Sequence, residues 1–364
     1  MRRICCFCES WESGGIEAFI HNVLLHMDLS QTEVDIVAER MKESVFTSDL
    51  KNKGIRFIEL SGRLRNPKNF RLFRDLLKER RYDVVHFNLF QGLSLYYAQI
   101  AKKESIPVRI AHSHGSGLRN SRTKRIKLFL HGIGRWMWTS AATDHWACSR
   151  QAGEFLFRKD QYRLEIIPNG IDVQRFQFSE EARKKVRTEL GIDEGVLLGT
   201  VGRLSSEKNQ SFLLDVFSVF LRINPSSLLV LVGEGEEKSA LMQKCEELGI
   251  ADKVVFYGLT NAVEELLSAM DLFVFPSLVE GLGIACVEAQ ASGLPVLCST
   301  AVPVEAKITP TVRALDLDEE AQCWAQTLAE IPLAQSRSVG SEMVRSAGYD
   351  ISDVALLVSK KYRE

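Results

Sequence analysis

The sequence lacks any long apolar run. No stretch reaches the roughly 18 apolar residues that a transmembrane helix requires. The N-terminal MRRICCFCESW contains a five-residue apolar run, whereas a secretory signal has roughly 7–15. We therefore expect a cytoplasmic protein whose first strand is buried. The 364 residues, of which 45% are hydrophobic and 26% charged, are typical of two globular domains.

Metal and redox signatures are also scarce. Cys5 and Cys8 form a C-x-x-C, but no second such pair follows, so we interpret them as small apolar residues of a buried strand. The D-x-D of Asp316 and Asp318 falls at the start of an acidic helical segment and is interpreted as solvated surface. We expect no metal and no cofactor. No nucleic-acid motif is present either, so nucleic acid is not an expected partner.

Short apolar segments alternate with helix-length amphipathic segments along the whole chain. Several, such as LLVLV at 228–232, are continuously apolar, as is typical of parallel strands covered on both faces. The alternation predicts βαβ units and two parallel sheets. The predicted strands are 3–8, 33–38, 55–60, 82–88, 108–114, 144–149, 164–168, 196–202, 227–233, 253–258, 271–276, 294–299 and 312–317.

Charge is divided unevenly between the two halves. Residues 1–170 hold 28 Lys and Arg against 18 Asp and Glu, a net charge of +10, while residues 171–364 carry −11. The basic residues crowd into 63–81 and 119–127, where interleaved apolar residues predict amphipathic helices. We expect the basic half to dock on the anionic inner leaflet of a membrane; a solvated helix face is the alternative.

A glycine-containing loop between a strand and a helix is the most informative feature. It lies in FPSLVEGLGIACVEAQASGLPV (275–296), where a helix is predicted from about residue 283 to residue 292. Gly281, Leu282 and Gly283 form the loop. Glycines at a helix N-terminus let backbone N–H groups approach a phosphate, and the helix dipole favours the anion.

Two glutamates flank this loop. Glu288 lies about five residues into the predicted helix, where its carboxylate could accept hydrogen bonds from ribose hydroxyls. Glu280, at the mouth of the loop, could do the same for a transferred sugar. A second strand–loop–helix stretch, TVGRLSSEKNQ (200–210), carries Arg203 and Lys208. Two cations at such an edge could neutralise a diphosphate leaving group without a metal. Structural glycines and solvated charges are the alternatives.

Arg203, Lys208 and the Glu280-x7-Glu288 pair, in this order, resemble the donor site of the retaining glycosyltransferases of family 4. The loop Gly14-Gly15-Ile16-Glu17 resembles the G-G-x-E loop of that family. The resemblance implies an α/β chain with the GT-B fold, in which two Rossmann-like domains with parallel sheets face a central cleft. It implies that Arg203, Lys208 and Glu280 act in catalysis, and that Gly15, Gly281, Leu282, Gly283 and Glu288 bind the donor.

The domain boundary is expected at IPNGID (167–172), which resembles the interdomain strand of the family. Residues 1–168 would form the acceptor-side domain and 169–349 the donor-binding domain, with a helix at 350–364 packing back on the first. The segment 298–317 lacks the Gly-Gly pair of many family members. It looks more like the subgroup that makes bacterial exopolysaccharide or capsule.

Two histidines stand at the end of a predicted strand, VRIAHSHG (108–115). His112 and His114 are two residues apart and so share one face at the carboxyl edge of the sheet, where open α/β sheets bind ligands. By resemblance, one such histidine lines the donor-sugar pocket, and we favour His114 as a catalytic residue. A structural histidine is the alternative.

The residues and the resemblance together predict a metal-independent, retaining transfer of a hexose. We expect the donor to be a UDP-linked sugar and the acceptor to be a hydroxyl of a lipid-linked or other glycan. Two alternatives stay open: a nucleotide-sugar 2-epimerase of the same fold, and a non-catalytic module that binds sugar nucleotides. Consumption of donor without an acceptor product would indicate the epimerase.

Overall fold

The computed structural model describes residues 1–364 except 13, 43, 119–122, 158–162, 193 and 334–336. The chain divides into two compact units. The N-terminal unit contains Met1–Gly170 and Gly348–Glu364, and the C-terminal unit contains Ile171–Ala347. The boundary expected after residue 168 lies two residues before this division.

Seven parallel strands form the sheet of the N-terminal unit, in the order β3-β2-β1-β4-β5-β6-β7. The strands are β1 (Arg2–Trp11), β2 (Thr32–Met41), β3 (Arg56–Glu59), β4 (Val84–Leu89), β5 (Val108–Ser113), β6 (Asp144–Ala147) and β7 (Leu164–Ile166). The helices are α1 (Gly15–His26), α2 (Thr47–Asn52), α3 (Lys68–Arg80), η1 (Gly92–Ser94), α4 (Leu95–Lys103), α5 (Lys124–Trp138), η2 (Thr139–Ala141), α6 (Arg150–Leu156) and α14 (Ile351–Arg363).

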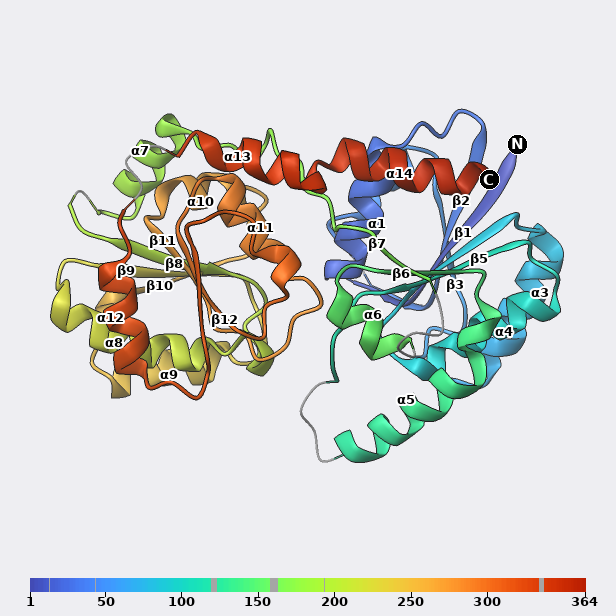
Figure 1. Ribbon diagram of the computed structural model, residues 1–364, viewed down its shortest axis with the longest axis horizontal. Helices are drawn as coiled ribbons and strands as arrows, with labels where there is room; N and C mark the ends of the chain where they lie inside the picture. Colours follow the sequence, from blue (N-terminus) through green and yellow to red (C-terminus); the bar gives the residue numbers. More distant parts are fainter. Residues whose placement is uncertain (13, 43, 119–122, 158–162, 193, 334–336) are drawn as a thin grey trace. The chain divides into compact units, whose positions relative to one another are not determined.

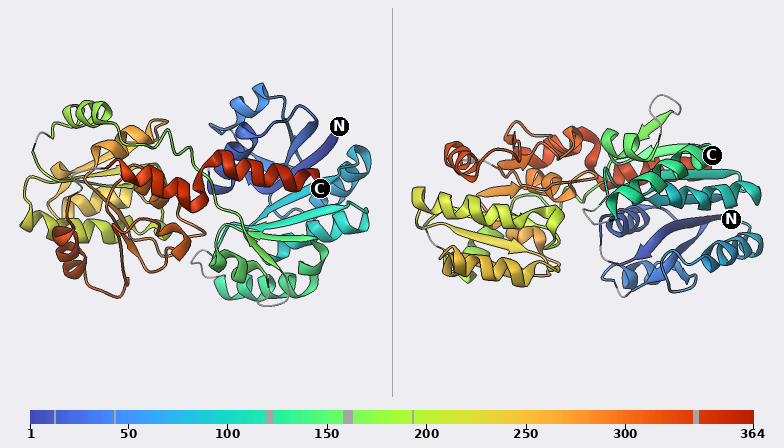
Figure 2. Two further views of the ribbon diagram at one scale, coloured as in Figure 1. Left: turned by 45° about the horizontal axis from the view of Figure 1, so that its top comes forward. Right: turned by 90° about the horizontal axis from the view of Figure 1, so that it is seen from below.

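Successive residues of β1 alternate between two hydrophobic cores. Ile4, Cys6 and Cys8 pack with α1 and α14 on one face of the sheet, and Cys5 and Phe7 pack with α3 and α4 on the other (Figures 1 and 2). The alternation follows from the two-residue period of a strand, and helices on both faces explain why the strand is apolar throughout. Cys5 and Cys8 are buried strand residues on opposite faces and form no disulfide, so the expectation of apolar packing is confirmed.

The C-terminal unit contains a six-stranded parallel sheet in the order β10-β9-β8-β11-β12-β13. Its strands are β8 (Leu197–Val201), β9 (Leu228–Val232), β10 (Val254–Gly258), β11 (Leu272–Phe275), β12 (Val296–Ser299) and β13 (Val312–Leu315). Its helices are α7 (Glu180–Glu189), η3 (Ser206–Lys208), α8 (Gln210–Ile223), α9 (Lys238–Glu247), η4 (Ala251–Lys253), α10 (Val263–Ala269), α11 (Ile284–Ala291), η5 (Val304–Ala306), α12 (Ala321–Glu330) and α13 (Val339–Val344). All thirteen predicted strands are confirmed, with ends that differ by three residues at most.

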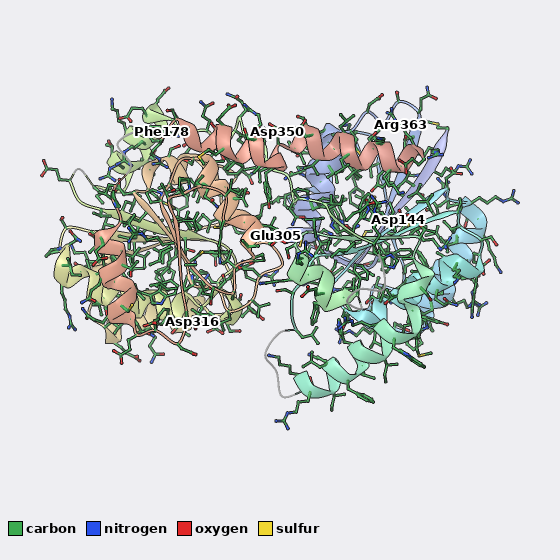
Figure 3. All side chains as sticks on the ribbon, viewed as in Figure 1. Asp144, Phe178, Glu305, Asp316, Asp350 and Arg363 are labelled. Atoms are coloured by element: carbon green, nitrogen blue, oxygen red, sulfur yellow. The ribbon has the colours of Figure 1, made fainter. Side chains whose placement is uncertain are left out.

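The chain returns to the N-terminal unit at Gly348, whose φ of +84° lies in the left-handed region that favours glycine. Asp350 then caps α14 by accepting a hydrogen bond from the Ser352 N–H (Figure 3). At the other end of the helix, the Lys361 ammonium lies 2.8 Å from the Asp144 carboxylate, and Tyr362 is buried in the core beside α1. The final helix is therefore an integral part of the N-terminal unit.

Candidate active site

The middle of each sheet is a topological switch point. In the C-terminal unit, β8 is followed along the chain by β9 on one side, whereas its other neighbour in the sheet is β11. In the N-terminal unit β1 lies likewise between β2 and β4. Open α/β sheets bind ligands beyond the carboxyl ends of the strands at such points. A ligand site is therefore expected at the loops that follow β8 and β11.

These two loops are joined by an ion pair. The Lys208 ammonium lies 2.5 Å from a carboxylate oxygen of Glu280, and the same ammonium lies 4.7 Å from the centre of the Phe275 ring. The backbone adds a second link, because the Leu278 N–H donates to the Glu207 carbonyl at 2.8 Å. Only 9% of the Glu280 side chain is exposed, so the pair is largely shielded from water and its charges act strongly on one another. Two predicted site residues thus meet directly.

Arg203 follows the same strand but is held differently. Its backbone carbonyl accepts a hydrogen bond from the Gln210 side chain at 2.9 Å, which fixes the loop, while its side chain is exposed. Among the ion pairs between described residues, none includes Arg203. The loop between β9 and α9 packs closely against this one, because a Cβ on Gly235 would lie 2.1 Å from the Leu204 carbonyl oxygen.

The loop before α11 depends on glycine at one position. Gly283 has a φ of +87° and precedes the first helical residue, and a Cβ there would also lie 3.2 Å from the Phe275 ring. Leu282 is buried and anchors the loop in the core, while Gly281 is half-buried. The predicted helix from about 283 to 292 is confirmed by α11. This helix is the next element after β11, which ends at Phe275.

Glu288 lies on the second turn of α11, as predicted, and its environment is unusual for a carboxylate. Burial raises the pKa of Glu288 to about 7; the charge of Arg175 lowers it and that of Glu264 raises it. A carboxyl group with such a pKa is both a donor and an acceptor near neutral pH. A carboxylate that costs free energy to bury is characteristic of a functional position.

In the N-terminal unit, His114 belongs to a buried chain of polar side chains. His86 Nε2 lies 3.1 Å from His112 Nδ1, and His86 Nδ1 lies 2.6 Å from the Tyr362 hydroxyl. The rings of His112 and His114 are 4.0 Å apart between centroids, which confirms that the two share a face. The sequence alone did not indicate a role for His86 or Tyr362. His86 could have been noticed, because it is a histidine inside the apolar strand VVHFNL (84–89).

Asn88 determines which ring nitrogen of His114 carries the hydrogen. The Asn88 amide nitrogen donates to the carbonyls of Phe7 and His86, so its oxygen must accept, and His114 Nε2 donates to it at 3.0 Å. In the neutral ring Nδ1 is then the acceptor, and it is buried with no protein partner among the described residues. Burial lowers the pKa of His114 to about 3. His114 is therefore a neutral residue that can accept a hydrogen bond from a ligand hydroxyl.

Gly15 is the first residue of α1. A Cβ at Gly15 would meet no atom within 4 Å, so packing inside the unit does not require glycine there. Glu17 has a structural contact instead: its carboxylate accepts a hydrogen bond from the Glu12 N–H at 3.0 Å. A role of Gly15 in the approach of a ligand stays a prediction.

Asp316 and Asp318 are exposed and lie in a turn that ends before α12. Their exposure agrees with the interpretation of this D-x-D as solvated surface.

In the described part of the chain, no group of three or more His, Cys, Asp or Glu side chains is arranged to hold a metal ion. The described helices also include none that is both long and apolar enough to span a membrane.

Known proteins resemble this chain over nearly its whole length. The family model Glycosyltransferase Family 4 matches residues 13–175, and Glycosyl transferases group 1 matches residues 182–321. EpsF of Bacillus subtilis (strain 168), which bears the name of a glycosyltransferase, is 30% identical over 361 residues, 96% of this chain and 93% of its own. The UDP-Gal:alpha-D-GlcNAc-diphosphoundecaprenol alpha-1,3-galactosyltransferase of Escherichia coli is 28% identical over 234 residues, 62% of this chain and 59% of its own.

Among solved structures, HepE of Anabaena in complex with UDP and glucose has a TM-score of 0.79 to this chain, at 19% identity, and covers 99% of both chains. Two parallel-sheet, Rossmann-like units with this likeness define the GT-B fold. The chain belongs to glycosyltransferase family 4. The family and the fold predicted from the sequence are both confirmed.

Proposed function

We propose that this glycosyltransferase moves a hexose, with retention of configuration, from a UDP-sugar to a hydroxyl of a lipid-linked glycan. Its setting would be the assembly of bacterial exopolysaccharide or capsule. The observation that carries the proposal is the Lys208–Glu280 pair at the switch point of the C-terminal sheet, beside the N-terminus of α11. This arrangement offers a cation, a carboxylate and helix N–H groups within one loop cluster.

Each group has a distinct proposed role. Lys208 and Arg203 stabilise the negative charge that develops on the departing diphosphate. Glu280 contacts the hydroxyls of the transferred sugar, and Glu288 contacts the ribose. The bond from the anomeric carbon to the diphosphate oxygen breaks, a bond to the acceptor oxygen forms on the same face, and the acceptor proton passes to a diphosphate oxygen.

A neutral His114 suits a contact with the donor sugar. A buried imidazolium would be costly, and its charge is not needed if the cations after β8 neutralise the diphosphate. His114 Nδ1 accepts a hydrogen bond in this proposal. Gly15 leaves room for the ligand at the start of α1, where a side chain would have projected into open space.

The relatives support the choice of donor and acceptor. The Escherichia coli relative is named for UDP-Gal and a diphosphoundecaprenol-linked acceptor, and HepE was solved with UDP and glucose. Neither fixes the sugar for this chain. A set of UDP-hexoses incubated with the full-length protein and membrane-extracted polyprenyl-diphosphate glycans tests the proposal. UDP release that depends on the acceptor, with a glycosylated product, is the expected result.

Two other outcomes of this assay contradict the proposal. Conversion of the donor into its 2-epimer without an acceptor product would indicate an isomerase. Binding of UDP without turnover on any acceptor would indicate a binding module.

We expect activity to survive chelation by EDTA, because Lys208 and Arg203 supply the charge that a divalent cation supplies in metal-dependent transferases. Loss of activity in EDTA that Mg²⁺ or Mn²⁺ restores would contradict that role for the two cations.

A second part of the proposal is that α5 docks on anionic lipid. The helix contains no Asp or Glu, and it carries Lys124, Arg125 and Lys127 in its first turns. Large apolar side chains on it are exposed, among them Phe129 at 69% and Trp136 at 72%. Amphipathic helices with basic and aromatic residues of this kind lie at membrane interfaces. The predicted basic residues Arg119 and Arg122 lie outside the described residues.

The rest of α5 explains why these side chains stay exposed. The helix is attached through its middle, where a Cβ on Gly134 would lie 2.3 Å from the backbone of Gly92. The His131 ring accepts a hydrogen bond from the Gly92 N–H at 2.9 Å. The other predicted basic helix, α3, is less available, because Arg74 pairs with Glu104 and Arg80 pairs with Asp35.

Sedimentation with phosphatidylglycerol vesicles tests the docking of α5. Each cation near an anionic surface contributes about 1 kcal/mol, so the triple change of Lys124, Arg125 and Lys127 to Glu should release the protein. A triple change to Glu at Arg71, Lys78 and Arg81, in and just after α3, is the matched control and should release less. Equal binding of the unchanged protein to phosphatidylcholine and phosphatidylglycerol vesicles at low salt would contradict docking by charge.

A further inference from the structure

A cavity of about 360 Å³ lies in the N-terminal unit. Side chains from three neighbouring parallel strands reach it: Glu39 from β2, Glu9 from β1, and Gln91 from just after β4. Because β1 is flanked in the sheet by β2 and β4, the cavity lies at the switch point of this sheet. Its position is topologically equivalent to that of the Lys208–Glu280 pair in the other unit, where a ligand is expected for the same reason.

Two carboxylates in this cavity are held by neutral donors. The hydroxyl of Ser94 and the amide of Gln91 donate to Glu9, and the Tyr97 hydroxyl donates to Glu39. Among the ion pairs between described residues, none includes Glu9 or Glu39. Burial raises the pKa of Glu9, and so does the charge of Glu39, while the hydrogen bonds from Ser94 and Gln91 and the charge of Arg65 lower it in part. Carboxylates placed in a cavity at this cost keep lone pairs that a ligand hydroxyl can use.

Part of the cavity lining is aromatic. The ring of Tyr96 packs 4.9 Å from that of Phe70 and 4.9 Å from that of Trp138, between centroids, and all three rings are half-buried. A wall of half-exposed aromatic rings offers flat apolar surface. The C–H groups on the face of a pyranose ring can pack on such a surface while its hydroxyls face the carboxylates.

Arg65, which also lines the cavity, has a strained backbone conformation. Its φ is +57°, which is unfavourable for a residue with a Cβ, and its N–H donates to Glu39 at 2.5 Å. Strained backbone of this kind is concentrated at ligand sites. With two carboxylates against one guanidinium, the cavity carries a net negative charge, so a uronate or a phosphate is disfavoured relative to a neutral sugar.

We propose that this cavity binds a neutral hexopyranose of the acceptor, with its hydroxyls on Glu9 and Glu39 and one ring face on Tyr96 and Trp138. The inference rests on the proposed function, since it assigns the acceptor of that reaction to a site. Trp138 is also the last residue of α5. A lipid-linked acceptor could therefore place its sugar in the cavity while α5 rests on the surface of the membrane that holds the lipid.

Saturation-transfer NMR on the full-length protein tests the site with the methyl α-glycosides of glucose, galactose, mannose and N-acetylglucosamine, and with methyl α-glucuronide as the anionic probe. At least one neutral glycoside should bind, and more strongly than the glucuronide. Glu9→Gln should weaken that binding about 10- to 100-fold, the scale for one hydrogen bond to a charged group. Trp138→Phe, which shrinks the aromatic wall, should also weaken it.

Two controls separate failures. Glu79→Gln, an exposed position on α3, should leave binding unchanged, and UDP added to the same samples should bind the Glu9 and Trp138 variants as well as the unchanged protein. The inference is wrong if UDP binds but no neutral glycoside does, if the glucuronide binds best, or if Glu9→Gln and Trp138→Phe bind the neutral glycoside normally. If UDP itself does not bind, the proposed function fails, because the donor site lies in the other unit.

Discussion

The two units have similar parallel sheets, but the polar side chains singled out in each differ in charge. In the C-terminal unit the groups are ionised and paired, as in Lys208 with Glu280. In the N-terminal unit burial keeps the histidines neutral, lowering the pKa of His86 and that of His114 to about 3. The difference suits a division of work. A departing diphosphate needs fixed cations, whereas sugar hydroxyls need neutral or accepting partners.

The largest effect should come from removing the cations of the C-terminal unit. Arg203→Ala or Lys208→Ala should lower turnover roughly 10²- to 10³-fold, the scale for losing a preorganised stabiliser of developing charge. The two variants should differ in stability, because only Lys208 holds the buried carboxylate of Glu280. A lower melting temperature is expected for Lys208→Ala and an unchanged one for Arg203→Ala.

Initial rates at saturating donor and acceptor, with thermal melts of the same samples, check both statements. Lys238→Ala is the matched control: Lys238 pairs with Glu234 one turn away in sequence, at a half-exposed position. Near-normal turnover in both site variants would remove the two cations from the mechanism and with them the contrast between the units.

The next effect concerns Glu288. Glu288→Gln should weaken UDP binding roughly 10- to 100-fold, since a hydrogen bond to a charged group contributes about 1.5–3 kcal/mol. Glu280→Gln should leave UDP affinity nearly intact while lowering turnover, because Glu280 is proposed to contact the transferred sugar. Calorimetric titration with UDP and UDP-sugars distinguishes the two. Normal UDP binding by Glu288→Gln would show that the donor does not lie on α11.

Although Glu288→Gln should weaken UDP binding, it should stabilise the ligand-free protein. Since the pKa of Glu288 is raised to about 7 from an ordinary 4.5, its ionised form opposes folding above pH 7, by up to about 3 kcal/mol at 1.36 kcal/mol per pKa unit. Glu288→Gln should therefore raise the melting temperature of the ligand-free protein at pH 8 and have little effect at pH 4.5. A lower melting temperature at pH 8 would mean that the carboxylate is there for stability.

Local sequence patterns were sufficient for the strands and for the loop before α11. Parallel strands covered on both faces are continuous apolar runs, so LLVLV (228–232) could be assigned without knowing its neighbours. Gly283 could be placed because one backbone conformation at a helix start requires it. In both cases the cause lies within a few residues of the effect.

Long-range contacts were beyond such patterns. The hydrogen bond between Tyr362 and His86 joins residues 276 positions apart, and Glu9 and Glu39 share a cavity only because β1 and β2 are neighbours in the sheet. Arg203, Lys208 and Glu280 were each predicted as site residues, yet the direct pairing of Lys208 with Glu280 was not. Polar residues near the carboxyl ends of apolar strands, such as Glu9 and Glu39, are the signal that would have pointed to the cavity.

The smallest effect is a difference in how the two units respond to acid. In the N-terminal unit, His86 and His114 have folded pKa values of about 3, and burial also lowers the pKa of His112 well below 6.5. Between pH 6.5 and pH 3 the unfolded chain binds protons that the folded unit cannot, so stability falls as the pH falls, by at most about 1.4 kcal/mol per histidine and pH unit. Glu288 does the reverse: its folded pKa is raised, so the C-terminal unit gains stability as the pH falls from 7 towards 4.5.

Hydrogen exchange measured by mass spectrometry tests this difference, with peptides assigned to each unit and rates corrected for intrinsic pH dependence. Protection should fall in β4 and β5 between pH 7 and pH 5.5, while β8 and β11 keep their protection. His86→Asn removes one titrating ring and should make the loss in β4 and β5 less steep, even if it lowers stability at every pH. An equal loss in both units, or an earlier loss in β8 and β11, would mean that the histidine chain is not kept neutral by burial, and the contrast between a charged and a neutral site would no longer hold.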